Sequence, residues 1–145
     1  MHLTTMKLTD VERYIPVFLS AFTGEPWNEP WTREAARTRL EQFLSPVHAF
    51  GLALEERGEV IAFVLGRYEA YFDGMRFFIE ELCCSRRGEG HGTRLLRALE
   101  EKLWEQGVVR ISLMTIHGDA TEGYYARRGY AAEAENLWMY KQREL

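Results

Sequence analysis

Residues 85–96, SRRGEGHGTRLL, combine closely spaced glycines with flanking arginines and lead directly into an apolar helical pattern. The first N–H groups of a helix have no partner within the helix and carry a partial positive charge. Glycines such as Gly88, Gly90 and Gly92 let the backbone approach an anion, because no Cβ stands in the way. The segment therefore predicts a loop that holds a phosphate or pyrophosphate at the start of a helix.

Arginines around this loop add charge and bidentate hydrogen bonding: Arg86, Arg87, Arg94 and Arg97. Two common phosphate-binding motifs do not fit the residues. A P-loop needs a lysine followed by serine or threonine after its last glycine, and this pair is missing. The dinucleotide fingerprint GxGxxG would require glycine at Thr93 or at Leu95. A nucleotide-binding domain is therefore disfavoured.

The elements that must position the loop form a strand-helix-strand unit at 76–116. RFFIEELCCS before the loop and VVRISLMTI at 108–116 read as strands, and 93–106 reads as a helix that ends at Gly107. The helix has an inward apolar stripe: Leu95, Leu96, Leu99, Leu103 and Trp104. A unit of this kind predicts a parallel pair of strands with a right-handed crossover.

Two helices are expected upstream. The first spans 9–22, with Thr9 and Glu12 as a capping box and with Pro16 predicted to kink or split it. Thr32 is expected to cap the second. The buried stripe expected for the second helix is Ala36, Leu40, Phe43, Leu44 and Val47.

The remaining segments complete a mixed, mostly antiparallel sheet. HAFGLALEE and EVIAFVLGRYEAYF flank a hairpin turn at Arg57-Gly58, and Asp73-Gly74 marks another turn before the third strand. A short helix near 120–128 ends at Gly129, and YAAEAENLWMYK predicts one bent strand or a pair. The expected order is ααβββαβαβ(β), an α/β fold in a single domain spanning 1–145.

Composition favours an ordinary globular protein. The chain has 145 residues, 46% of them apolar, and a net charge of −4, which disfavours nonspecific nucleic-acid binding. No apolar run is long enough to cross a membrane, and the first residues do not resemble a signal peptide, so a cytoplasmic location is expected. Neither the adjacent Cys83 and Cys84 nor the scattered histidines have zinc-ligand spacing, so no metal is expected.

The hexapeptide RGEGHG, residues 87–92, fits the pattern Q/R-x-x-G-x-G/A and resembles the coenzyme A pyrophosphate loop of the GNAT acyltransferase superfamily. The segment YYARRGY resembles a second motif of this family, and LWMYK is similar to its final strand. The resemblance covers nearly the whole chain. It implies the GNAT fold, in which the parallel strands splay apart and acetyl-CoA lies in the gap between them.

The resemblance implies a cofactor-binding set. The pantetheine arm would pair with the backbone of Glu80–Ser85, with Leu82 and Cys84 as the expected contacts. The strand runs into the loop with fewer intervening residues than usual, which leaves the register open by about two residues. The pyrophosphate would be held by the backbone of the loop: Arg87, Gly88, Glu89, Gly90, His91, Gly92 and Thr93.

The implied reaction is direct transfer of the acetyl group to an amine. Tyr125, four residues before Gly129, corresponds to the family's general acid, and the alternative is a core aromatic residue. Glu80 is the candidate base, on the same strand parity as Leu82, with a salt bridge or a water relay as alternatives. Cys84 is expected to be a buried, inert cysteine rather than an acylated nucleophile.

The irregular segment GEPWNEPW between the two helices is expected to wall the acceptor pocket through cation–π and charge attraction. The candidate substrate-binding residues are Glu25, Trp27, Glu29 and Trp31, with Tyr68, Tyr71 and Asp73 near the hairpin tip. The alternative is that the tryptophans cover the core and the acids are solvated. The predicted function is N-acetylation of a small-molecule amine by a possible homodimer. The alternatives are acetylation of a protein or peptide and a non-catalytic CoA-sensing module.

Overall fold

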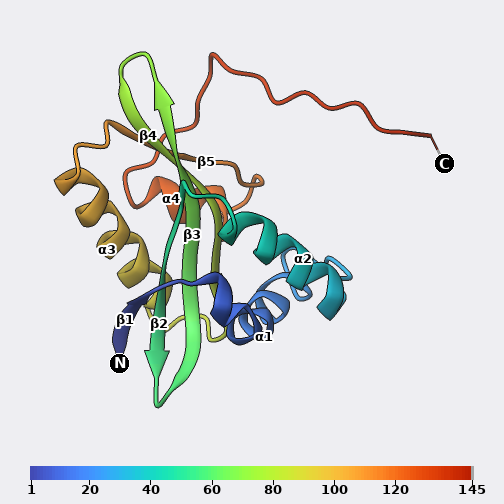
Figure 1. Cartoon of the computed structure of the whole chain (residues 1–145). Coiled ribbons are helices and arrows are strands. Elements are labelled where there is room, and N and C mark those ends of the chain that lie inside the picture. Colours follow the sequence, from blue (N-terminus) through green and yellow to red (C-terminus); the bar gives the residue numbers. More distant parts are fainter. Residues whose placement is uncertain (145) are drawn as a thin grey trace. The chain divides into compact units, whose positions relative to one another are not determined.

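The computed structural model describes residues 1–144 and divides into two compact units, Met1–Met114 and Thr115–Leu145, each described here by itself. Most regular elements lie in the first unit (Figure 1). They are β1 (His2–Thr5), η1 (Leu8–Asp10), α1 (Val11–Phe22), α2 (Arg33–Leu44), β2 (Ala49–Glu56), β3 (Glu59–Tyr71), β4 (Gly74–Cys84), α3 (His91–Glu105) and β5 (Arg110–Leu113). The second unit contains α4 (Glu122–Ala126).

The five strands form one sheet in the order β1-β2-β3-β4-β5. The first four pair antiparallel and β5 pairs parallel with β4, which confirms the predicted mixed sheet. The hairpin between β2 and β3 turns at Arg57 and Gly58, which both have positive φ as expected. The edge strand β1 was not predicted, because four residues of HLTT carry little periodicity.

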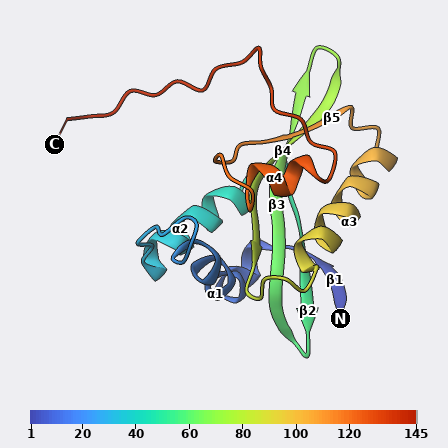
Figure 2. The same cartoon turned by 180° about the vertical axis from the view of Figure 1, so that it is seen from behind.

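The two faces of the sheet are covered by different helices (Figures 1 and 2). On one face, here called the helix-pair face, α1 and α2 pack over a core that includes Phe63 and Leu65 of β3. The opposite face, here called the α3 face, is covered by α3, whose expected leucines Leu95, Leu96, Leu99 and Leu103 are all buried. The expected stripe was wrong only at Trp104, which is half exposed.

Helix α1 differs from the prediction at its start and at Pro16. Thr9 lies inside the 3-10 turn, so it cannot occupy the N-cap position, and the capping box does not form. Glu12 instead forms ion pairs with Arg33 and Arg37 of α2. Pro16 does not split the helix, because the buried face of α1 packs continuously on the core on both sides of it.

Helix α2 begins as predicted, because the Thr32 hydroxyl accepts a hydrogen bond of 3.1 Å from the Ala35 N–H. Ala36 and Leu40 are fully buried in the core. The prediction was wrong at Val47, which is fully exposed, because the helix ends at Leu44 and the stripe does not extend past it.

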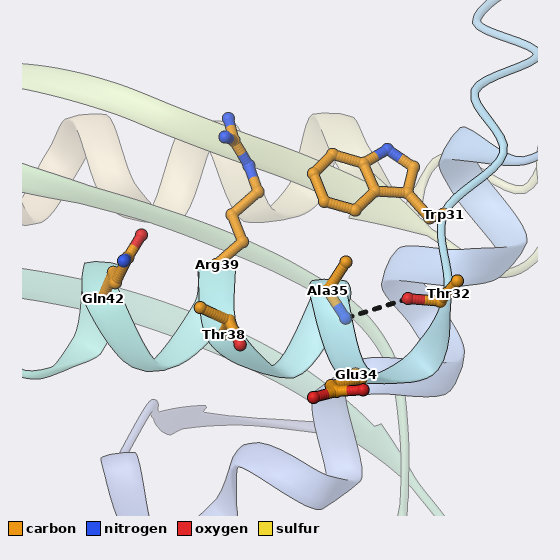
Figure 3. A pocket seen from close by; sticks show the side chains of 7 residues that line it. All are labelled: Trp31, Thr32, Glu34, Ala35, Thr38, Arg39 and Gln42. Carbon is orange, nitrogen blue, oxygen red and sulfur yellow. Dashed lines mark hydrogen bonds between the residues drawn. The ribbon is translucent and has the colours of Figure 1, made fainter.

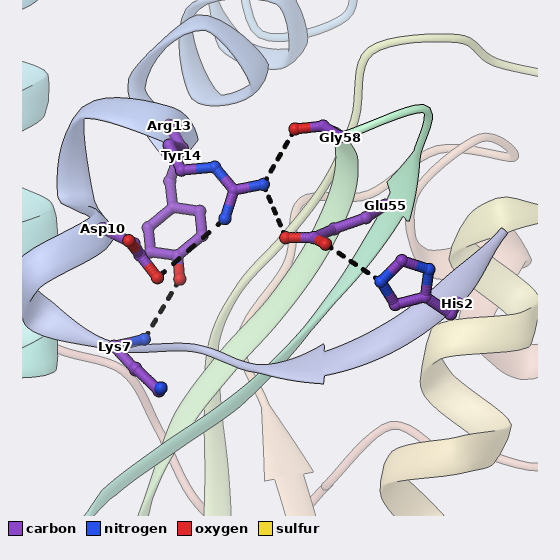
Figure 4. Close-up of polar contacts among 7 residues, drawn as sticks. All are labelled: His2, Lys7, Asp10, Arg13, Tyr14, Glu55 and Gly58. Carbon is purple, nitrogen blue, oxygen red and sulfur yellow. Dashed lines mark hydrogen bonds and ion pairs between the residues drawn. The ribbon is translucent and has the colours of Figure 1, made fainter.

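A buried carboxylate joins the N-terminal strand and α1 to the β2–β3 hairpin (Figure 4). Glu55 of β2 receives a hydrogen bond of 2.6 Å from Arg13 and contacts His2 at 3.2 Å. The same guanidinium donates to the Gly58 carbonyl at 3.0 Å, and the Lys7 N–H donates to the Tyr14 hydroxyl at 3.0 Å. These contacts connect three segments that are distant in sequence.

In the second unit, α4 is shorter than the predicted 120–128, and Gly129 follows it with φ 92° as expected for a helix stop. The predicted final strand at 130–141 was wrong for the described residues, where no ladder pairing forms. An apolar sequence makes a strand only where a partner edge satisfies its backbone. Its large apolar side chains are exposed: Leu137, Trp138, Met139 and Tyr140.

Candidate functional site

Strands β4 and β5 stop pairing halfway along β4. Their parallel rungs run from Arg76–Arg110 to Ile79–Leu113 and stop there, whereas β4 continues to Cys84. Over Glu80–Cys84 the strand pairs with β3 alone, so within the described residues one backbone edge of this segment has no strand beside it. An extended ligand can add to such an edge as a strand does.

A β-bulge lies where the two strands part. Gly66 of β3 pairs with Ile79 and Leu65 pairs with Glu81, so Glu80 is an extra residue without a cross-strand partner. Side chains of a strand normally alternate between the two sheet faces, and the bulge interrupts this alternation at Glu80. Glu80 and Glu81 both lie on the helix-pair face, as their partners Arg67 and Arg39 show. The expectation that Glu80 shares a face with Leu82 and Cys84 was therefore wrong.

Glu80 forms an ion pair with Arg67 of β3 and is 15% exposed. The Arg67 guanidinium also lies over the Phe78 ring at 4.7 Å and within 3.8 Å of Glu69. The salt bridge that the sequence left open as an alternative is therefore present. The ion pair with Arg67 holds the Glu80 carboxylate at the position where β4 and β5 diverge.

Glu81 is more deeply buried, at 7% exposed, and accepts a hydrogen bond of 2.5 Å from Arg39 Nε of α2. Burial raises the pKa of the Glu81 carboxyl above its ordinary value, although Arg39 opposes this shift. The Arg39 guanidinium also lies over Phe43 at 4.6 Å and over Trp31 at 5.7 Å. Nothing in the sequence pairs Arg39 with Glu81, because the two residues are far apart in the chain.

The glycine loop connects the free end of β4 to α3. Gly88 and Gly90 have φ values of 79° and 80°, and a Cβ at either position would meet no atom within 4 Å. Among described residues, the N–H groups of 87–90 donate to no backbone carbonyl outside regular elements. Open space beside unpaired N–H groups at a helix start suits the pyrophosphate predicted from the sequence.

Charged side chains hold the loop in place. Arg86 contacts Glu56 at 2.5 Å and Glu89 at 3.1 Å, and Glu89 also contacts His91 at 2.9 Å. Arg86 is therefore engaged within the protein. Arg87 forms no ion pair with any residue of 1–144, so its charge stays available for an anionic ligand.

The two cysteines are not activated. Burial raises the pKa of the Cys83 thiol far above its ordinary value, and it also raises that of Cys84, where Arg87 and the Gly92 N–H act in the opposite direction. A thiol with a raised pKa is a poor nucleophile. This agrees with the expectation that Cys84 is an inert cysteine rather than an acylated nucleophile, and its backbone contact with the cofactor stays a prediction.

The two tryptophans of the GEPWNEPW segment pack against the core, as the alternative reading expected. Trp27 contacts Phe22 with ring centroids 5.5 Å apart, and Trp31 contacts Phe18 at 4.9 Å. Glu25 is exposed. An open depression lies beside Trp31 on the surface of α2 (Figure 3). It is lined by Trp31, Thr32, Glu34, Ala35, Thr38, Arg39 and Gln42.

Tyr68 and Tyr71 do not join this depression. Tyr68 lies on the α3 face, where it contacts Phe77 at 5.2 Å and donates a hydrogen bond of 2.6 Å to Gln106. Tyr71 lies at the β3–β4 hairpin tip under the Arg76 guanidinium, which is 3.8 Å from its ring centroid. Asp73 contacts the same arginine at 2.9 Å. The expected single pocket wall is therefore split between the two sheet faces and the hairpin tip.

Tyr125, the predicted acid, lies in α4 of the second unit. Its ring packs edge-on against Tyr124 at 5.2 Å and against Tyr130 at 5.8 Å. The Tyr125 carbonyl accepts a hydrogen bond of 3.1 Å from the Tyr130 N–H, which closes the turn around Gly129. Its catalytic role stays a prediction.

Two further kinds of site are missing from the part of the chain that the structure describes. No group of three or more His, Cys, Asp or Glu side chains there is arranged to hold a metal ion. None of the helices there combines the length and apolar character needed to cross a membrane.

The family model of the Acetyltransferase (GNAT) family matches residues 16–130. No curated protein sequence matches the chain significantly. Among solved structures, a possible acetyltransferase from Clostridium difficile 630 has a TM-score of 0.81 at 12% identity, covering 99% of this chain and 98% of that one. The ribosomal-protein-alanine N-acetyltransferase from Brucella melitensis biovar Abortus 2308 has a TM-score of 0.76 at 16% identity, covering 97% and 100%.

A third similar structure is the aminoglycoside N-acetyltransferase AAC(6')-Iy in complex with CoA. It has a TM-score of 0.69 at 18% identity, covering 98% of this chain and 94% of that one. At such low identities these structures show a shared fold. The family model carries the assignment, because it matches most of the chain.

Proposed function

Because the chain belongs to the GNAT acetyltransferase family, we propose that it moves an acetyl group from acetyl-CoA to a primary amine of a small molecule. The observation that carries this proposal is the continuity of two features. The free backbone edge of Glu80–Cys84 leads directly into the glycine loop at the start of α3. One feature suits the extended pantetheine arm and the other suits the pyrophosphate of a single ligand.

The residues present fit acetyl-CoA. An L-residue at Gly88 or Gly90 would be strained, whereas glycine leaves the loop N–H groups open to a diphosphate. Arg87 adds a positive charge that is not already neutralised by a carboxylate within residues 1–144. Leu82 and Cys84 would contribute backbone groups to the arm. The bound donor supplies the thioester, and the protein residues position it.

The proton transfers are assigned to two residues. The acceptor amine attacks only as a neutral base, so it must lose a proton, and Glu80 is the proposed acceptor, directly or through a water molecule. Its carboxylate is paired with Arg67 at the point where β4 and β5 diverge. The departing thiolate needs a proton, for which Tyr125 is proposed.

A small acceptor could bind in the open depression beside Trp31, which is lined by side chains of α2, its cap Thr32 and Trp31 itself. Among similar structures, one protein is named for aminoglycosides and another for a ribosomal protein, so peptide acetylation is the second candidate. A CoA-sensing module without turnover is the third. We also propose that residues 1–145 form one acetyltransferase domain, because the family model spans both compact units. We propose a cytoplasmic location for this domain.

The test is thermal unfolding with acetyl-CoA, CoA, ATP and NAD. A ligand at about 100 times its dissociation constant stabilises the native state by roughly 2.7 kcal/mol. We expect a clear shift with both CoA species and none with ATP or NAD. No shift with either CoA species would contradict the proposed function. Acetylation of a panel of amines, with a peptide included, then separates the small-molecule candidate from the other two.

A further inference from the structure

A cationic side chain lies inside a cluster of two aromatic rings and a buried carboxylate on the helix-pair face. The Arg39 guanidinium is 4.6 Å from the Phe43 centroid, 5.7 Å from that of Trp31 and 2.5 Å from a Glu81 oxygen. Trp31, Phe43 and Glu81 are here called the cation cage. Glu29 fixes one wall, because it accepts a hydrogen bond of 2.9 Å from Trp31 Nε1.

The cage has the chemistry that recognises organic cations. Aromatic faces attract ammonium and guanidinium groups, more strongly where water is partly excluded. Glu81 is only 7% exposed, so an ionised carboxylate there requires a cation. Each of the three cage residues therefore favours a bound cation. In the free protein this cation is the guanidinium group of Arg39.

The Arg39 side chain is not closed off from solvent. The Arg39 side chain is 39% exposed, and it borders the open depression on α2 (Figure 3). It extends from a helix on a long side chain, so it can leave the cage by rotating its own torsions without moving the backbone. The cage is therefore accessible to a small solute that enters through the depression.

The position of the cage connects it to the acetyl-transfer site. Glu81 is two residues beyond the last β4–β5 rung at Ile79, on the segment whose backbone edge is free. It is also next to Glu80, and the bulge places both side chains on the same face. A ligand group in the cage would therefore lie beside the proposed base.

We propose that the cation cage is an acceptor subsite, that Arg39 occupies it in the free protein, and that a cationic group of the acceptor displaces Arg39. This rests on the proposed function and narrows its substrate class. A group held against Glu81 stays protonated, so it cannot be the amine that attacks the thioester. The acceptor therefore carries at least two basic nitrogens, one bound in the cage and the other acetylated.

Displacement has a measurable consequence. When a side chain of the protein occupies a site, a competing ligand binds only the molecules in which the site is open. Its apparent dissociation constant is the intrinsic one divided by the fraction of open molecules. If the cage is open in one molecule in ten, removing the Arg39 side chain lowers the KM of a diamine about tenfold. A monoamine, which has no second cation, gains nothing from the vacated cage.

The first experiment measures binding alone. Arg39→Ala should unfold at a lower temperature than the wild type, and methylguanidinium should restore part of that loss by filling the cage. Uncharged urea at the same concentration should not. The wild type should need about ten times more methylguanidinium for the same stabilisation. Arg37→Ala, on the same helix but paired with Glu12, should behave like the wild type. Adding Glu81→Gln to Arg39→Ala should abolish the effect. Arg39→Gln provides a second variant without a cation, and absence of rescue in both would overturn the proposal.

The second experiment compares 1,5-diaminopentane with pentylamine as acceptors. Arg39→Ala is expected to lower the KM of the diamine about tenfold relative to the wild type and to leave that of pentylamine within a factor of two. An equal change for both amines would overturn the proposal. The acetyl-CoA thermal shift is measured in parallel on each variant. If acetyl-CoA does not raise the unfolding temperature of the wild type, the proposed function is contradicted. If it does, but Arg39→Ala changes the KM of both amines equally, only the proposed role of the cation cage is contradicted.

Discussion

Glu80 and Glu81 are consecutive residues of β4, yet both side chains lie on the sheet face that carries α1 and α2. The bulge at Glu80 produces this arrangement, and each carboxylate has its own arginine, Arg67 for one and Arg39 for the other. One carboxylate is partly accessible and the other is buried. The two are therefore expected to respond differently to mutation and to pH.

The Arg67–Glu80 pair can be tested through its effect on catalysis. Glu80→Gln is expected to lower kcat by about 100-fold or more, because a positioned base contributes roughly this much. Arg67→Met keeps the carboxylate but removes the arginine that holds it in place, so kcat should fall by less than in Glu80→Gln. Steady-state kinetics on the two variants measure both effects. An unchanged kcat in both would exclude Glu80 as the base.

The positive φ of the loop glycines gives a prediction with a matched control. Gly88→Ala and Gly90→Ala should each lose about 1–2 kcal/mol of stability, since an L-residue is strained at these φ values. Gly58→Ala introduces the same strain at φ 80° in the β2–β3 turn. Only the two loop variants should also lose acetyl-CoA affinity, measured by calorimetry. Equal affinity in all three would contradict the proposed role of the loop.

Local signals in the sequence were sufficient for several parts of this fold. Thr32 predicted a helix start through its own hydroxyl, and Gly107 and Gly129 predicted helix stops, because each requirement is met within a few residues. The glycine loop was found in the same way. The final strand at 130–141 failed because a strand depends on a partner edge that its own residues do not specify.

The site geometry depended on register, which the sequence does not encode locally. Nothing in the run EELCC marks Glu80 as an extra residue whose side chain is rotated relative to that of Leu82. The same limit applies to Arg39, whose partner Glu81 is set by the packing of α2 on the sheet. Tyr68 was assigned to the acceptor pocket from its nearness in sequence to the hairpin tip, but strand alternation places it on the α3 face.

The Glu55 network predicts a loss of stability without loss of the site. Glu55→Ala removes a carboxylate that is hydrogen-bonded to Arg13 and contacts His2 (Figure 4), and it should cost about 1.5–3 kcal/mol, the usual range for hydrogen bonds to charged groups. Glu12→Ala breaks exposed ion pairs and should cost less than about 1 kcal/mol. Urea unfolding of both variants decides this prediction, which fails if the two losses are equal.

Glu81 should make the folded protein less stable as the pH rises. Its pKa in the folded state is raised above the ordinary value of 4.5, chiefly by burial, so the native state retains a proton that the unfolded state releases. The free energy of unfolding therefore falls as pH increases from about 4.5 through the raised pKa of Glu81. Glu81→Gln lacks this contribution. The difference between the two proteins, measured by urea unfolding from pH 4 to 8, should favour the variant increasingly toward higher pH, and a constant difference would contradict the assignment.

Tyr125 and Tyr124 form a matched pair for the proposed acid. They are neighbours in α4 with rings 5.2 Å apart, so replacing either by phenylalanine removes one hydroxyl and keeps the ring packing. Tyr125→Phe should lower kcat by about 100-fold or more, in the range of general acid catalysis, and should leave the acetyl-CoA thermal shift intact. Tyr124→Phe should retain kcat within a few-fold. A more acidic thiol leaves as a thiolate with less need of protonation. With S-phenyl thioacetate as the donor, the difference in kcat between Tyr125→Phe and the wild type should therefore be smaller. If the difference is the same for both donors, the hydroxyl of Tyr125 acts in some step other than protonation of the leaving thiolate.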